Sequence, residues 1–261
     1  ARVLWLIPAM DRLWIEGAEG RRRFLDRVTL SMLPDHAELS LSYEKAMRER
    51  NRLLKDGTDE PAWIEGLDAT LVETGMAIAA ARLDLVDALN HALPDATGLF
   101  LAPKLQMDGL LENALTAGKP AVKIEAEFKH ALKASLPEDR RAGQTQTGPH
   151  RSDLKAWHEQ KNIPADQCST GEQKAMLIAI ILAFNELIRA RDKRAPILLL
   201  DDVASHLDSS RQNALLTRLA ESGGQCWISG TNLPDIPAEI AYTHYTIADD
   251  RIILAQQTES K

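Results

Sequence analysis

The feature that most constrains the fold of this chain is a short aliphatic run that ends in two acids, IleLeuLeuLeuAspAsp at 197–202. An uninterrupted apolar run of this length is typical of a buried strand. Helical patterns lie on either side of it, from Ser169 to about Arg191 and from Ser209 to Glu221, and a second apolar run follows at 225–229. This alternation predicts a parallel sheet in a two-layer α/β fold, with the acids at the carboxyl edge, where such folds bind ligands.

Helical patterns dominate the first half of the sequence. Apolar residues recur on one face between Gly20 and Leu33, with cations opposite, which indicates an amphipathic helix. Two longer patterns, Glu38 to Lys55 and Pro61 to Ala92, are separated by a turn-rich break, so we expect an antiparallel helical pair. A further helix is expected from about Ile124 to Arg141, and the glycines and prolines of 96–123 predict strands or irregular structure before it.

Three other segments are expected to form strands. ValLeuTrpLeuIle at 3–7 is a short apolar run that ends at a breaker, Pro8. The alternating threonines of 144–154 predict a strand that ends in a turn. The stretch from Tyr242 to Gln256 alternates on both sides of AlaAspAsp at 248–250, which predicts a closing hairpin.

Composition limits the class of protein. With 44% hydrophobic residues among 261, the chain can bury a core, so disorder is not the default. The longest uninterrupted apolar run, Ala175–Phe184, is shorter than the roughly 20 residues that cross a bilayer, and we expect no membrane association. Cys168 and Cys226 lie far apart without metal-ligand spacing, which favours a reducing compartment, and we expect the cytoplasm.

The formal net charge of −7 argues against a protein that coats nucleic acid indiscriminately. Contact with DNA phosphates would have to come from local clusters of cations, such as Arg21, Arg22 and Arg23 or the Arg and Lys residues of 45–55. A cationic helix face is more often simply solvated, and the cations of 45–55 alternate with glutamates, which favours pairing within the helix. DNA contact by the three arginines is therefore a hypothesis with a structural alternative.

The two acids that follow the aliphatic run repel each other unless a cation or a shared proton relieves them, and magnesium is the cation expected there. In a Walker B arrangement, Asp201 would hold Mg²⁺ through its water shell and Asp202 would orient the attacking water. The alternative is that the acids only end a strand and begin a turn. Asp208 also has a structural interpretation, as the N-cap of a helix that begins at Ser209.

A second motif, CysSerThrGlyGluGlnLysAla at 168–175, precedes the most apolar helix of the sequence. Ser169 with Glu172, and Thr170 with Gln173, both satisfy the capping-box pattern, so the simplest interpretation is a well-capped helix start. The free N–H groups and the positive dipole end of a glycine-containing helix start also form an anion site. The two interpretations are compatible, and a phosphate group could bind here.

SerThrGlyGluGlnLys at 169–174, followed by LeuLeuLeuAspAspValAlaSerHisLeuAsp at 198–208, resembles the signature, Walker B and D-loop series of SMC-like ABC ATPases. Within that class, GlyProHisArgSerAspLeu at 148–154 and ArgArgArgPheLeuAsp at 21–26 resemble the RecF family in particular. These matches cover both ends of the chain. The sequence thus resembles a RecF-type DNA repair ATPase.

The resemblance implies the α/β fold of an ABC-type ATPase head with an inserted, mainly helical lobe II. Residues 1–34 would end the N-terminal ATPase subdomain, residues 35–142 would form the helical lobe, and residues 143–261 would form the C-terminal ATPase subdomain. The resemblance also implies ATP and Mg²⁺ as cofactors, and an ATP-dependent homodimer that binds DNA at junctions of single and double strands. RecR, RecO and RecA are the implied partners in recombinational gap repair.

The resemblance further implies roles for single residues. Ser169 and Gly171 would meet the γ-phosphate of an ATP molecule held by a second subunit, with Gln173 and Lys174 nearby. The other implied roles are metal binding by Asp201, catalysis by Asp202, and D-loop contacts across the dimer by Ser205 and Asp208.

The sequence departs from the family pattern in three places. It contains no GxxxxGK[ST] phosphate loop, because the GlyLys pair at 118–119 is followed by Pro120 and preceded at the required position by Asn113. In the family this loop precedes the point where the chain begins, so we expect a C-terminal portion of a longer protein that is inactive as an ATPase by itself. Thr231 occupies the usual position of the switch His, and Asp202 is a carbon shorter than the usual Glu, which predicts slow ATP turnover in the full-length protein.

His150 and Arg151 follow GlyPro and are candidates for residues beside the nucleotide, although a His in this context is more often a turn residue with satisfied hydrogen bonds. Two other functions stay open. One is another SMC-like or transporter-type ABC ATPase, and an absence of ATP-dependent DNA retention would support the transporter type. The other is a non-enzymatic helical interaction module, in which replacing Asp201 by Asn would leave function intact.

Overall fold

The computed structural model describes residues 2–57, 60–93, 101–205 and 207–258. Contacts within the chain divide it into two compact units. The first, here called the sheet unit, comprises Ala1–Asp11, Pro94–Ala102 and Ser169–Lys261, and the second, the helical unit, comprises Arg12–Leu93 and Pro103–Cys168. Each unit is therefore assembled from segments that are far apart in the sequence.

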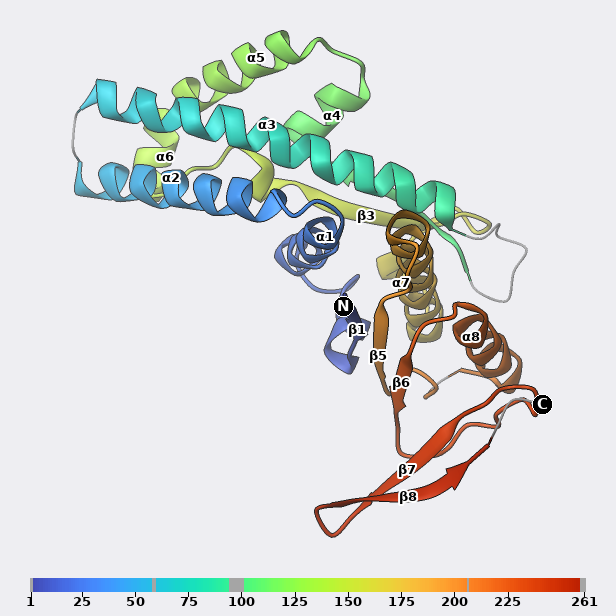
Figure 1. Cartoon of the computed structure of the whole chain (residues 1–261). Helices are drawn as coiled ribbons and strands as arrows, with labels where there is room; N and C mark the ends of the chain where they lie inside the picture. Colours follow the sequence, from blue (N-terminus) through green and yellow to red (C-terminus); the bar gives the residue numbers. More distant parts are fainter. Residues whose placement is uncertain (1, 58–59, 94–100, 206, 259–261) are drawn as a thin grey trace. The chain divides into compact units, whose positions relative to one another are not determined.

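The helical unit contains the long helices expected from the sequence. Its α-helices are α1 (Ala18–Met32), α2 (His36–Asp56), α3 (Pro61–Ala92), α4 (Leu110–Thr116), α5 (Ala121–Ala134) and α6 (Leu136–Ala142). Helices α2 and α3 pack side by side along their length (Figure 1), which confirms the predicted helical pair. α2 ends where Gly57 adopts a φ of 66°, the left-handed conformation that often terminates helices.

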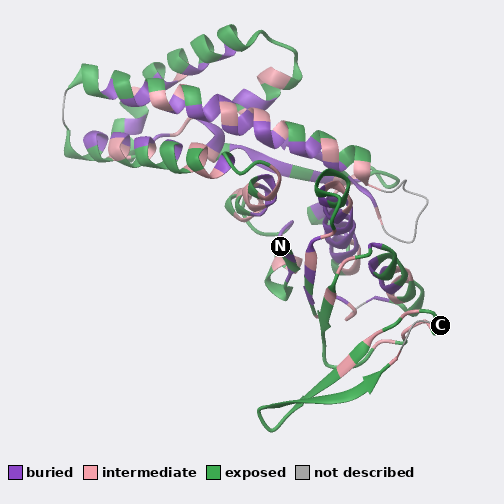
Figure 2. Ribbon diagram, in the orientation of Figure 1, coloured by how far each residue is buried: buried purple, intermediate pink, exposed green. Residues whose placement is uncertain are grey.

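The core of the helical unit is a cluster of apolar residues contributed mainly by α2, α3 and α5. Figure 2 shows buried positions on each of these three helices. Leu71 of α3 and Phe128 and Leu132 of α5 are completely buried. A small antiparallel sheet completes the unit, in the order β2 (Pro103–Asp108), β3 (Asp153–His158) and β4 (Ile163–Pro164). It contacts α1 and α3, and short 3₁₀ turns, η2 (Pro149–Arg151) and η3 (Ala165–Gln167), flank its strands β3 and β4.

The sheet unit is built around three parallel strands, in the order β1 (Val3–Leu6), β5 (Ile197–Asp201) and β6 (Cys226–Ser229). A 3₁₀ turn, η1 (Pro8–Arg12), follows β1, and α7 (Thr170–Asp192) and α8 (Ser209–Glu221) precede β5 and β6. The predicted alternation of strand and helix, and the parallel sheet, are confirmed. The carboxyl ends of β5 and β6 therefore share one edge of the sheet.

The two faces of this sheet differ. Leu6 and Leu200 are buried and pack with apolar residues of both α7 and α8. On the opposite face Trp5, Leu199 and Trp227 are neighbours in register on the three strands, and they are 36%, 41% and 51% exposed. Both α7 and α8 pack on the face that carries Leu6 and Leu200. The strand formed by the aliphatic run is therefore buried on one face only, whereas a fully buried strand was expected.

A two-stranded antiparallel hairpin, β7 (Thr243–Ala248) and β8 (Arg251–Gln257), ends the described part of the sheet unit. Its turn residues Asp249 and Asp250 have φ angles of 52° and 57°, as a tight two-residue hairpin turn requires. The predicted hairpin is confirmed.

Three predictions about secondary structure were wrong in part. The segment 144–148 is not a strand, because its N–H groups are bound by side chains: Thr145 donates to Asn51 and Gln146 donates to Asp139. The helix expected over 124–141 is broken at Ser135, since Pro137 has no N–H to continue the first helix. Leu110–Thr116, within the segment expected to be strand or irregular, is a helix composed mostly of the helix formers Leu, Glu and Ala. Residues 96–100 lie outside the described part.

The contacts group the chain differently from the ranges 1–34, 35–142 and 143–261, since residues 12–34 and 143–168 belong to the helical unit. The assignment of those ranges to ATPase subdomains stays a prediction. Within the part of the chain that the structure describes, no helix is both long and apolar enough to cross a membrane.

Candidate functional site

The start of α7 carries the first group of predicted site residues. Ser169 is the N-cap, and its side chain and that of Glu172 form the reciprocal capping box: Ser169 Oγ accepts from the Glu172 N–H at 3.4 Å and Glu172 Oε2 accepts from the Ser169 N–H at 2.9 Å. A Cβ added to Gly171 would meet no described atom within 4 Å. Packing within the described chain therefore does not require a glycine at this position.

Beyond its first turn, α7 is anchored in the interior. Gln173 and Lys174 are 2% and 4% exposed, and the residues from Ala175 to Asn185 are all buried. Burying so many apolar side chains along one helix contributes strongly to stability, which fixes the position of the helix start. Gln173 and Lys174 therefore lie under the surface that Ser169 and Gly171 present.

The ammonium of Lys174 connects α7 to the loop after β5. It donates to the main-chain oxygen of Asp202 at 2.7 Å and to Ser205 Oγ at 3.2 Å, and it lies 3.4 Å from the carboxylate of Asp11. The two sequence motifs, which lie far apart along the chain, are thus in direct contact.

The acid pair lies at the carboxyl edge of the sheet, as predicted. Asp201 ends β5 and is exposed, and its Oδ1 accepts a hydrogen bond of 2.6 Å from Ser229 Oγ at the end of β6. Asp202 has a φ of 52°, its N–H donates to the Ser229 carbonyl, and its carboxylate accepts from Ser205 Oγ at 2.9 Å. The two carboxylates therefore have different partners, one on the neighbouring strand and one in their own loop.

The side-chain oxygens at this edge are the carboxylates of Asp201 and Asp202 and the hydroxyls of Ser205 and Ser229. Mg²⁺ prefers oxygen ligands and is usually held by one or two carboxylates together with waters and phosphate oxygens. No cluster of three His, Cys, Asp or Glu side chains suited to a metal occurs among the residues that the structure describes. The edge fits Mg²⁺ bound together with a phosphate rather than a closed protein site.

The remaining candidates of the sheet unit are Asp208 and Thr231. Asp208 is the N-cap of α8, since its Oδ1 accepts from the Arg211 N–H at 2.9 Å, which is the structural role considered for it. Thr231 is exposed and lies just beyond the end of β6. No described contact joins either residue to the acid pair.

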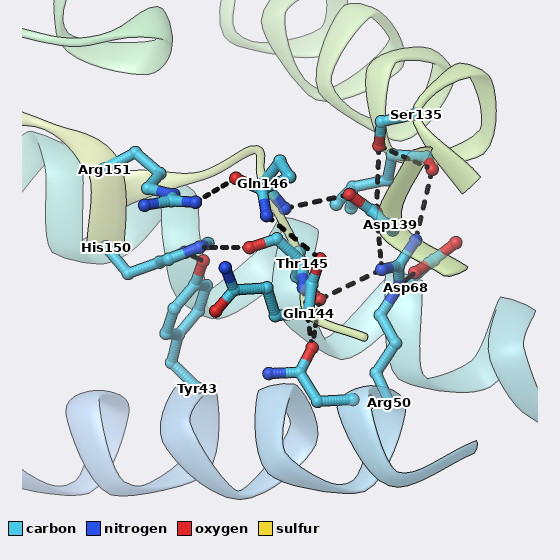
Figure 3. Close-up of polar contacts among 12 residues, drawn as sticks. Tyr43, Arg50, Asp68, Ser135, Asp139, Gln144, Thr145, Gln146, His150 and Arg151 are labelled. Atoms are coloured by element: carbon cyan, nitrogen blue, oxygen red, sulfur yellow. Dashed lines mark hydrogen bonds and ion pairs between the residues drawn. The ribbon is translucent and has the colours of Figure 1, made fainter. Parts of the chain in front are cut away.

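Two candidates, His150 and Arg151, lie in the helical unit (Figure 3). His150 Nδ1 accepts from the Tyr43 hydroxyl at 2.7 Å and its Nε2–H donates to the Thr145 carbonyl at 3.0 Å, a tautomer assigned from these partners. Burial lowers the pKa of His150 to about 4, so the ring is neutral at physiological pH. Arg151 is exposed and donates to the side chain of Gln146.

The three arginines of α1 have different surroundings. Arg21 pairs with both carboxylate oxygens of Asp153, at 2.7 and 2.9 Å, and Arg22 donates to the Ser152 carbonyl at 2.7 Å. Burial lowers the pKa of Arg22 from its usual value. Arg23 is exposed and pairs with Glu19 one helical turn away. Of the three, Arg23 is therefore the most accessible to an external phosphate.

Comparison with known proteins decides the family. A scan of protein-family models finds no match. The protein named "DNA replication and repair protein RecF" from Mesorhizobium japonicum is 47% identical over 234 residues, which are 88% of this chain and 61% of that protein. The protein of the same name from Rhizobium johnstonii is 38% identical over 254 residues, which are 96% of this chain and 67% of that protein. This chain belongs to the RecF family.

The chain spans about 61% of the length of the Mesorhizobium and Brucella RecF proteins that it matches. A solved structure described as "the recombination mediator protein RecF-ATP in RecFOR pathway" superposes with a TM-score of 0.81 at 25% identity, over 97% of this chain and 68% of that one. A second, described as RecF-ATPrS, shares the fold with a TM-score of 0.82 at 24% identity. The predicted α/β fold of an ABC-type head is confirmed.

Sequence patterns did not identify two residues that complete the site of this RecF family chain, or a third that supports a loop beside it. Ser229 binds Asp201, and Asp11 pairs with Lys174. Gln212 lies outside the site and donates its side-chain amide to the carbonyls of Ala204 and Leu207. Ser229 could have been found, because it follows an apolar strand at the same edge as the acids. Asp11 and Gln212 lie on a turn and on a helix face, where the sequence carries no signal for such contacts.

Proposed function

We propose that this chain supplies the signature half of one ATP site and the Walker B half of another, in a dimeric ATP-dependent DNA-binding protein of recombinational gap repair. The observation that carries the proposal is that the capped start of α7 and the acid pair after β5 lie in one unit and are joined by Lys174. The sheet edge offers oxygen ligands, and the helix start offers N–H groups to a phosphate. Relatives named as RecF at 38–47% identity support the repair role.

In the proposed site, Asp201 binds Mg²⁺ and Asp202 orients the attacking water. Ser169 and Gly171 contact the γ-phosphate of ATP held by a second subunit, which makes the active form a homodimer. When bound, ATP would supply the electrophilic γ-phosphorus, and Mg²⁺ held by Asp201 would neutralise the negative charge on the phosphate oxygens. Asp208 and Thr231 complete the pocket from the D-loop and from the end of β6. The aspartate in place of a glutamate at Asp202 fits slow turnover.

Closure of the dimer on ATP is the proposed function, and hydrolysis acts as a timer that releases DNA. The proposed ligand is DNA at junctions of single and double strands, with Arg23 as one of the cations that contact phosphate. The matched RecF structure is described as that of a recombination mediator in the RecFOR pathway, which supports RecO and RecR as partners. The recombinase that we propose to be loaded is RecA, as the family resemblance implies. The proposed compartment is the cytoplasm, where the thiols of Cys168 and Cys226, neither of which is in a disulfide in the described structure, would stay reduced.

The proposal is tested by ATP-dependent retention of a fluorescent junction DNA on the full-length protein, measured by anisotropy at moderate salt. We expect retention with ATP, and longer retention by Asp202→Asn because release requires hydrolysis. Asp235→Asn, which removes a carboxylate elsewhere in the sheet unit, should behave as the parent. Absence of any ATP-dependent retention would favour a transporter-type ATPase, and full function of Asp201→Asn would favour a helical interaction module.

A further inference from the structure

Lys174 is buried although it carries a charge. Its side chain is 5% exposed, and an ammonium in such a position is costly unless it is paired and hydrogen-bonded. Three acceptors surround it, the Asp202 carbonyl, Ser205 Oγ and the Asp11 carboxylate, and an ammonium has three N–H donors. All of these acceptors belong to the sheet unit itself, so the position of the ammonium is set by contacts within the chain.

The acceptors of Lys174 come from two different segments of the sheet unit. Asp11 lies in the turn η1 after β1, whereas Asp202 and Ser205 lie in the loop after β5. Asp202 has a φ of 52°, which non-glycine residues seldom adopt, and a hydrogen bond to its carbonyl stabilises that conformation. The same conformation directs its carboxylate to Ser205 Oγ. Lys174 therefore supports the backbone geometry that aims the carboxylate of Asp202.

We infer that Lys174, itself anchored by Asp11, is a positioning residue that fixes Asp202 relative to the start of α7. The inference rests on the proposed function and concerns how the site is regulated. In the proposed dimer, the start of α7 and the acid pair of one chain serve different ATP molecules. The Lys174 contacts thus link the two nucleotide sites. Through them, the ATP molecule bound against Ser169 influences the position of the Asp202 carboxylate, which serves the other ATP molecule.

Gln212 provides a matched comparison, because it also supports the loop after β5. Its amide donates to the carbonyls of Ala204 and Leu207 at 2.9 and 3.1 Å, from α8 instead of α7. It has no described contact with Asp202 or with α7. Gln212→Met should therefore loosen the loop without disturbing the connection between Asp202 and the helix start.

The test compares Lys174→Met, Asp11→Asn and Gln212→Met in the full-length protein, with Asp202→Asn as the reference for lost catalysis. Without nucleotide, amide hydrogen exchange at 203–205 should be about tenfold faster in Lys174→Met, which loses a charged hydrogen bond, and less accelerated in Asp11→Asn. With ATP, kcat should fall in the same order while the affinity for ATP stays at the parental value, because neither side chain contacts the nucleotide. Gln212→Met should speed exchange near 207 and keep the parental kcat.

Unchanged exchange at 203–205 in both Lys174→Met and Asp11→Asn would overturn the inference whatever the turnover shows. Suppose that Asp202→Asn abolishes turnover, but Lys174→Met shows faster exchange at 203–205 with the parental kcat. This result would also overturn the inference, and it would leave the proposed function intact. Parental turnover in Asp202→Asn would instead refute the proposed function, and the exchange data would still decide whether Lys174 holds the loop. If Lys174→Met fails to fold, Asp11→Asn carries the test, because Asp11 is partly exposed and asparagine has the same shape.

Discussion

Each unit contains a buried cation, and the two cations differ in what they hold. Arg50 in the helical unit is completely buried and binds Asp68 and Asp139, whose carboxylates are 7% and 0% exposed (Figure 3). Lys174 in the sheet unit binds groups of a loop at the exposed edge of a sheet. Arg50 and the carboxylates that it binds are thus enclosed by protein. Lys174, by contrast, binds a loop whose neighbouring carboxylates, Asp201 and Asp202, are accessible to water.

The difference separates a structural network from a functional one. Arg50 also donates to Thr145 Oγ1 and to the Leu132 carbonyl, so it joins α2 to α3, α5, α6 and the segment before η2. A network with every member satisfied makes the packing of its helices specific. At the sheet edge, by contrast, Asp201 is exposed and has one described partner, Ser229. The first arrangement has no room for a ligand, and the second is open to one.

The largest expected effect is on the enclosed network. Arg50→Met leaves Asp68 and Asp139 buried without their cation, and we expect the free energy of unfolding to fall by about 3–5 kcal/mol. Arg48→Met is the matched control on the same helix. The Arg48 side chain is 69% exposed and its ion pair with Glu44 is long, at 3.9 Å. Losing this pair should lower the free energy of unfolding by less than about 0.5 kcal/mol. Urea denaturation followed by circular dichroism measures both. Similar losses in the two variants would show that Arg50 does not hold this unit together.

A smaller effect is expected from acid. Burial lowers the pKa of His150 to about 4, so the folded protein binds this proton less readily than the unfolded chain. The contribution of His150 to stability is therefore fully present above about pH 6.5 and is lost as the pH falls to about 4, by roughly 3 kcal/mol.

His150→Gln should remove this part of the pH dependence, because glutamine does not titrate. The lowered pKa values of Asp26 and Asp153 add their own acid sensitivity, but they are common to parent and variant and cancel in the difference. His91→Gln, at an exposed position of α3, should keep the parental profile. Urea denaturation at several pH values checks this, and equal profiles for His150→Gln and the parent would contradict the burial of a neutral ring.

Local patterns predicted the sheet unit well because its chemistry is encoded in contiguous segments. The aliphatic run and its acids, the capping box of Ser169 and the N-cap role of Asp208 each depend on residues within a few positions of one another. In the helical unit the long helices were found in the same way. What depends on neighbours distant in sequence was missed. The turn at 144–148 has its N–H groups bound by Asn51 and Asp139, and no periodicity reveals such partners.

The site shows the same division. The family resemblance implied that Ser169 and Gly171 meet a phosphate and placed Lys174 nearby, whereas the structure directs the ammonium of Lys174 to Asp202, Ser205 and Asp11. The sequence marks a lysine as a cation and does not show whether it points outward or inward. Side-chain direction follows from packing, which requires the fold.

The smallest effect on stability is expected from replacing a helical glycine by alanine, which adds one methyl group. This substitution can be made in both units, so it allows a direct comparison of them. Gly171 at the start of α7 and Gly66 in α3 are helical glycines at which a Cβ would meet no described atom within 4 Å. Alanine at either position should raise the free energy of unfolding by up to about 1 kcal/mol, because alanine is the better helix former. If a phosphate approaches the start of α7, the methyl group of Gly171→Ala obstructs it, so ATP-dependent retention of DNA by the full-length protein should weaken in this variant and persist in Gly66→Ala. Equal retention by the two alanine variants, together with equal stabilisation, would mean that the open space beside Gly171 is not occupied by nucleotide.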